Sequence, residues 1–206
     1  MSAELSATAT VEEILSKKSV IELRELARSF YVKGSSKMRK VELISEVKAA
    51  LMIPERLEEL LYVLDSAAWQ TFRKAAESSE PVKLNLTESR WYQILHGLCY
   101  LHFITGNRSL SCNVPPEIRT VYDSLVTDGL IQRKKHYDQL HLYAEAAANL
   151  YGVISQDDFV ALFNSQNEDK TSKEELFDAL IRHIVVDAGY CFWDKYIVDI
   201  GFEDNG

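Results

Sequence analysis

Hydrophobic residues recur at spacings of three and four in two short segments near the start of the chain. The first segment begins at Ser19-x-x-Glu22, which has the residue types of a capping box at a helix N-terminus. The apolar positions that follow are Val20, Leu23, Leu26, Ala27 and Phe30. This period predicts a helix with one apolar stripe facing a core.

A second helix is predicted to end near residue 51. Gly34 is suited to a left-handed turn after the first helix, and Ser35 or Ser36 is suited to cap the next one. The apolar stripe of this second helix consists of Val41, Ile44, Val47 and Leu51, with Leu43 at its edge. The two helices and the loop between them predict a helix-extended loop-helix module over residues 19–51.

Helical patterns continue through the rest of the chain, separated by polar breaks. They are predicted after Pro54, Asp65 and Pro115, and again at LYAEAAANLY, DFVALFNSQ and ELFDALIRHI. The segment from His136 to His141 lies between two of these patterns and is mostly polar. It is predicted to be an exposed loop.

Two segments have the pattern of a β-hairpin. YLHFITGNRSLSCNVP is expected to turn at Thr105-Gly106-Asn107-Arg108, and YCFWDKYIVDIGF at Trp193-Asp194-Lys195. Because helices followed by a hairpin occur twice, we predict a mostly α fold with minor β structure, in which a helical body carries two winged-helix-like units. The predicted domains are a loose N-terminal segment with a short helix (1–18), the module (19–51), a helical unit with a hairpin (52–135) and a second helical unit with a C-terminal hairpin (136–206).

Charge is distributed unevenly between the module and the rest of the chain. Residues 17–51 hold nine Lys and Arg against four Glu, which gives +5, whereas the whole chain carries −8, so the remaining residues sum to −13. The cations of the loop are Lys33, Lys37, Arg39 and Lys40, with no carboxylate among them. Three of these are expected in or beside the first turn of the second helix, where they oppose the helix dipole but where backbone N–H groups favour an anion.

The motifs Leu23-x-x-Leu26-Ala27, Val32-Lys33-Gly34 and SKMRKVELI resemble the small N-terminal helical domain of the transcription terminator Rho. They are also similar to the SAP-type helix-extended-helix motif. The resemblance covers about a sixth of the chain. It implies nucleic-acid binding through phosphate contacts from the four loop cations, a role related to transcription, and a bacterial source. SAP motifs are associated with DNA, and the choice between DNA and RNA stays open.

The resemblance does not extend beyond the module. No tight β-barrel pattern with stacking aromatics follows residue 51, so the ATPase and termination activities of Rho are not carried over. No Gly-rich phosphate loop, nucleophile elbow, HExxH or EF-hand pattern is present, and we therefore assign no catalytic residue and expect no enzyme. His96-x-x-Cys99-x-x-His102 has zinc-type ligands but lacks the usual paired spacing, so we expect no metal site and no cofactor.

The acidic body is expected to contact protein rather than nucleic acid. The helical segment SKEELFDALIRHI carries Glu174, Glu175 and Asp178, whose carboxylates repel phosphate. We therefore expect weak, non-specific binding of nucleic acid by the basic module and a protein interface on the acidic body. The alternative is a protein-interaction scaffold that does not bind nucleic acid.

The remaining compositional features concern location. No apolar run approaches the length of a membrane span, and residues 1–13 lack the basic and apolar regions of a signal peptide. The three cysteines are widely spaced and odd in number, as expected for reduced thiols. These features predict a cytoplasmic protein without a membrane partner.

Overall fold

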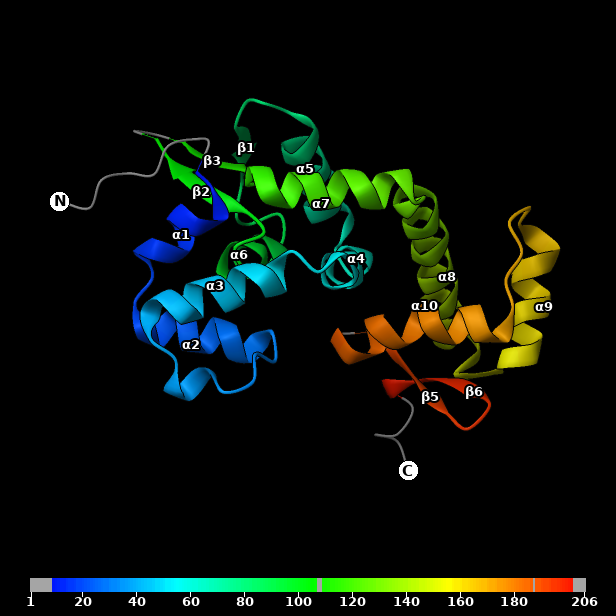
Figure 1. Ribbon diagram of the computed structural model, residues 1–206. Coiled ribbons are helices and arrows are strands. Elements are labelled where there is room, and N and C mark those ends of the chain that lie inside the picture. The colour runs from blue at the N-terminus through cyan, green and yellow to red at the C-terminus, as the bar shows by residue number, and fades with distance from the viewer. Residues whose placement is uncertain (1–8, 107–108, 187, 202–206) are drawn as a thin grey trace. The chain divides into compact units, whose positions relative to one another are not determined.

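The computed structural model of the chain describes residues 9–106, 109–186 and 188–201 (Figure 1). These residues form ten α-helices and two three-stranded antiparallel sheets, which confirms the predicted fold class, mostly α with minor β. The chain divides into two compact units, Met1–Asp128 and Gly129–Gly206. The finer domain boundaries after residues 18, 51 and 135 stay a prediction.

The first unit begins with α1 (Val11–Lys17), α2 (Val20–Ser29) and α3 (Lys40–Leu51). The predicted capping box starts α2: the Ser19 hydroxyl accepts from the Glu22 N–H, and the Glu22 carboxylate accepts from the Ser19 N–H. The predicted stripe of α2 is buried at Leu23, Leu26, Ala27 and Phe30. This face packs on α3, so that the two helices lie side by side (Figure 1).

The start of α3 differs from the prediction. Ser35–Lys37 form a short 3-10 helix, η1, and the N-cap of α3 is Arg39 instead of a serine. The Arg39 N–H donates to the Glu42 carboxylate at 2.7 Å, which supplies the cap. The buried positions of α3 are Leu43, Val47, Ala50 and Leu51. Val41, which was predicted to face inward, is 78% exposed, because the face that packs on α1 and α2 is centred on Leu43.

The other elements of the first unit are four helices and three strands. They are α4 (Pro54–Tyr62), α5 (Ser66–Glu77), β1 (Val82–Leu84), α6 (Trp91–Gly97), β2 (His102–Thr105), β3 (Leu110–Asn113) and α7 (Pro116–Thr127). Of these, α5 packs on β1 and β3. The predicted hairpin is confirmed by the antiparallel pairing of β2 with β3, while Asn107 and Arg108 of its predicted turn lie outside the described residues. The short strand β1, which was not predicted, completes the sheet in the order β1-β3-β2.

The second unit has the same succession of helices followed by a hairpin. Its elements are α8 (Leu130–Tyr151), β4 (Val153–Ser155), α9 (Gln156–Gln166), α10 (Lys173–Val186), β5 (Tyr190–Trp193) and β6 (Tyr196–Asp199). The second predicted hairpin is confirmed by β5 and β6, with Asp194 at φ 54° in its turn. The strand β4 adds to β6, which gives the order β4-β6-β5. Among the described residues, no helix combines the length and apolar character that a bilayer crossing needs.

The predicted loop between His136 and His141 is wrong. Both residues belong to α8, which is continuous from Leu130 to Tyr151. Polar side chains of this stretch contact residues of α8 and of its neighbours: the Lys134 ammonium lies 2.5 Å from the Asp138 carboxylate, and His141 Nδ1 lies 2.8 Å from the Tyr190 hydroxyl. Polar composition here therefore reflects a partly buried polar network on a helix rather than a solvated loop.

Candidate nucleic-acid interface

A buried aromatic residue, Phe30, holds the C-terminal end of α2 against the rest of the first unit. Phe30 packs edge-on against Tyr100, with ring centroids 6.1 Å apart. The guanidinium of Arg56 lies over the Phe30 ring and donates to the Phe30 carbonyl at 2.7 Å. The extended loop that carries the basic residues therefore starts from an anchored point. Gly34 then takes the predicted left-handed conformation, with φ 75°.

Lys40 connects the first turn of α3 to the end of α1. Its ammonium donates to the Ser16 carbonyl at 2.9 Å. Ser16 is in the last turn of α1, where carbonyls lack partners within the helix and where the dipole favours a cation. This contact offsets the unfavourable placement of Lys40 at the N-terminus of its own helix. Lys40 therefore has a structural contact in addition to its predicted role at phosphate.

The structure adds Lys18 to the predicted site. Hydrogen bonds from Ser19 lower the pKa of the Glu22 carboxyl, and the charges of Lys18 and Lys40 lower it further. Lys18 and Lys40 therefore lie close to the same carboxylate, although they are far apart in sequence. Sequence reasoning counted Lys18 only in the net charge. Its position between the end of α1 and the capping box was the signal that could have placed it here.

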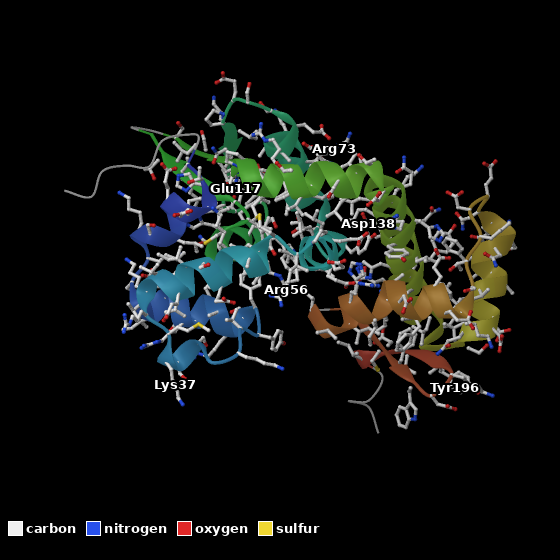
Figure 2. All side chains as sticks on the ribbon, in the orientation of Figure 1. Lys37, Arg56, Arg73, Glu117, Asp138 and Tyr196 are labelled. Carbon is white, nitrogen blue, oxygen red and sulfur yellow. The ribbon has the colours of Figure 1, made fainter. Side chains whose placement is uncertain are left out.

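All four predicted cations have exposed side chains, and within the described residues three of them differ from Lys40 in making no side-chain hydrogen bond. Lys33, Lys37 and Arg39 are exposed. In the described parts of the chain, none of these three side chains has a hydrogen-bond or ion-pair partner. Figure 2 shows Lys37 projecting from η1 away from the helices. These side chains are available for contacts with an anion without first breaking an internal interaction.

The four predicted cations are spread along α2 and do not form one cluster. Lys33 follows the C-terminal end of α2, whereas Lys40 lies near Glu22 in its first turn. A helix of ten residues is about 15 Å long, so the extended loop carries charge along most of one side of α2. Residues 26–41 contain five Lys and Arg and no Asp or Glu. This spacing fits an extended polyanion better than a single small anion.

His96 and Cys99, two of the residues considered as zinc ligands, lie in surroundings that do not need a metal ion. His96 Nδ1 lies 3.1 Å from the Leu101 carbonyl, and its ring stacks on Phe103 with centroids 4.1 Å apart. Cys99 is buried, and burial raises the pKa of its thiol to about 11. In the parts of the chain that the structure describes, no three His, Cys, Asp or Glu residues are grouped so that they could hold a metal ion.

Comparison with known proteins identifies a similarity in the segment that contains these cations. Residues 15–55 match the family model of the Rho termination factor, N-terminal domain. No curated protein and no solved structure matches the chain. The matched segment runs from the last turns of α1 to the start of α4, so it includes Lys18 as well as the loop. The match confirms the predicted resemblance: the basic module of residues 19–51 lies in a segment similar to the Rho termination factor N-terminal domain.

Proposed function

We propose that the chain is a non-enzymatic, nucleic-acid-associated protein whose basic module binds the phosphate backbone. The observation that carries this proposal is the row of exposed cations, Lys33, Lys37 and Arg39, on a carboxylate-free segment within the Rho N-terminal-like match. Contacts to phosphates position a protein on nucleic acid but do not read its sequence. The proposed binding is therefore independent of sequence.

The proposed binding is weak at physiological salt. Few cations are available, and each phosphate contact loses affinity as salt rises because counterion release becomes less favourable. The residues outside 17–51 sum to −13 and add a general repulsion. A location in the cytoplasm and a role related to transcription are part of the same proposal. The strand order β4-β6-β5, with a hairpin after the last helix, supports the winged-helix interpretation as a scaffold.

Charge reversal in the loop tests this function. The variant Lys37→Glu/Arg39→Glu should lose most of its affinity for a labelled duplex at low salt, measured by fluorescence anisotropy, because both side chains are exposed and no contact holds them. The matched control is Lys74→Glu/Lys83→Glu, which reverses two exposed cations of the same unit and changes the net charge equally. The control should bind nearly as wild type does. Equal losses in both variants, or no loss in the loop variant, would contradict the proposal.

A protein interface on the second unit is a second candidate function. Phe177 on α10 stacks on Phe192 of β5, with centroids 5.2 Å apart, and is nevertheless 47% exposed. Trp193 and Val185 are 62% and 79% exposed. Exposed apolar side chains of this size are a common feature of protein contact surfaces. The absence of any salt-dependent shift with nucleic acid at low salt would favour this scaffold function over the first.

A further inference from the structure

Tyr31 occupies a backbone position that glycine usually takes. The helix α2 ends with two hydrogen bonds, from the Tyr31 N–H to the Arg28 carbonyl at 2.9 Å and from the Val32 N–H to the Ala27 carbonyl at 2.8 Å. This pair of bonds is a Schellman motif, in which the first residue after the cap is left-handed. Tyr31 has φ 54°. A residue with a Cβ atom is strained in this conformation, whereas glycine is not.

The strained backbone holds the Tyr31 ring in solvent. Its side chain is 87% exposed, although the preceding residue, Phe30, is buried against Tyr100 and beneath Arg56. Within the described residues, the Tyr31 hydroxyl has no hydrogen-bond partner. The ring thus contributes little to the fold while its backbone costs stability. Backbone strain of this kind tends to occur at functional sites.

The surroundings of Tyr31 are cationic. Arg28 precedes it by one turn of α2 and Lys33 follows it by two residues, and both side chains are exposed. The nearest carboxylates in sequence are Glu25 and Glu42, outside the segment 26–41. An exposed aromatic ring between cations combines the two features with which proteins bind unpaired strands, a stacking surface for a base and charges for the backbone.

We propose that Tyr31 stacks on an unpaired base while Arg28 and Lys33 contact the adjacent phosphates, so that the module prefers single-stranded nucleic acid to duplex. The inference rests on the proposed function and deepens it by naming the class of ligand. In a duplex the faces of the bases are covered by their neighbours, so a tyrosine ring has no face to stack on without unstacking a step. Phosphate contacts alone would give no marked difference in affinity between a duplex and a single strand.

The test compares the full-length protein and its variants on labelled oligothymidylate, oligouridylate and a duplex of equal length, by fluorescence anisotropy at low salt. Tyr31→Ala should lower single-strand affinity by about fivefold or more. A loss of about fivefold corresponds to the lower end of the free-energy range for one base–aromatic stack. Tyr31→Phe should retain affinity, because it keeps the ring. Duplex affinity should change by less than about twofold. Tyr151→Ala removes another exposed tyrosine, 56% exposed in the second unit, and should have no effect.

Tyr31→Gly separates binding from folding. Glycine relieves the left-handed strain, so this variant should melt at or above the temperature of the wild type while losing single-strand affinity as Tyr31→Ala does. Wild-type affinity for single strands in both Tyr31→Ala and Tyr31→Gly would overturn the stacking proposal. So would an equal loss on single strands and duplex. If the wild-type protein binds duplex and single strands equally, the preference for single strands is refuted but phosphate binding is not. If it binds neither, the proposed function itself is refuted.

Discussion

The imidazole rings of His141 on α8 and His183 on α10 stack in parallel, with centroids 3.8 Å apart and planes 5° apart. His141 Nδ1 lies 2.8 Å from the Tyr190 hydroxyl. The Nε2 atom of His183 is buried and, among the described residues, has no hydrogen-bond partner. Burial lowers the pKa of both rings, and burial together with the smaller effects of His141, Lys134 and Arg182 brings the pKa of His183 to about 3. Both rings are therefore favoured in their neutral form at about pH 7 in the folded second unit.

This pair predicts that the second unit loses stability in mild acid. An unfolded histidine titrates near 6.5, whereas the pKa of folded His183 is about 3 and that of folded His141 is lowered. The stability is therefore greatest above pH 6.5 and declines as pH falls from there toward 3. Each group contributes at most about 1.4 kcal/mol per pH unit. Urea unfolding between pH 7.5 and 4.5 measures this slope. The variant His183→Gln should have a shallower slope, and an unchanged slope would show that other groups cause the dependence.

The contact between Lys40 and the Ser16 carbonyl predicts a difference between two neighbouring lysines. Lys40→Met removes a cation from the C-terminal end of α1 and should lower the free energy of unfolding by about 0.3–1 kcal/mol. Lys37→Met serves as the control, since Lys37 has no such contact within the described residues and should leave stability unchanged. Chemical denaturation of both variants at low salt gives the comparison. Equal stabilities would mean that the Lys40 contact contributes nothing.

Asp65 joins the start of α5 to the segment before α6. Its Oδ1 accepts from the Ala68 N–H at 2.8 Å, and its Oδ2 accepts from the hydroxyl of buried Ser89 at 2.6 Å. Asp65→Ala should lower the melting temperature, because it removes an N-cap, worth about 1 kcal/mol, and leaves the Ser89 hydroxyl without its acceptor. Asp65→Asn retains an acceptor for the cap and should lose less. Similar melting temperatures for Asp65→Ala and wild type would contradict this role.

The three cysteines should differ in reactivity. Burial raises the pKa of the Cys99 thiol to about 11 and that of the Cys112 thiol to about 12, whereas Cys191 is only partly buried. Because the thiolate is the reactive species, native protein at pH 8 should react with a thiol reagent first at Cys191. Mass spectrometry after brief labelling identifies the site. Labelling of Cys99 or Cys112 at a comparable rate would mean that the first unit opens readily.

Sequence patterns predicted the elements whose signals are local. The capping box at Ser19 and the spacing of three and four located α2, and the two hairpins followed from alternating segments with a turn between them. The strands β1 and β4 were not predicted, because each has only three residues and is defined by its pairing with another strand. Examples are the pairs Val82 with Cys112 and Ile154 with Ile197. Such strands carry no periodicity of their own.

The prediction failed where tertiary contacts override composition. The polar stretch around His136 resembles a loop in sequence, but ion pairs and ring stacking place it on α8. The loop cations were predicted from their charge and from the resemblance to the Rho N-terminal domain, both of which are visible in sequence. Lys18 joins them only through the packing of α1 on α3, and Tyr31 is distinguished only by its backbone dihedral angle and exposure. The packing of α1 on α3 and the dihedral angle of Tyr31 cannot be derived from residue types, although the position of Lys18 just before the capping box is visible in the sequence.

The salt dependence of duplex binding tests the central claim most directly. Four phosphate contacts from Lys33, Lys37, Arg39 and Lys40 predict a slope of log affinity against log salt of about −3.6, about −0.9 for each contact. Lys37→Ala/Arg39→Ala should reduce the magnitude of the slope by about 1.8, while Lys74→Ala/Lys83→Ala should leave it unchanged. A slope near zero for the wild type, or the same slope in the loop variant, would contradict the assignment of phosphate binding to the basic module.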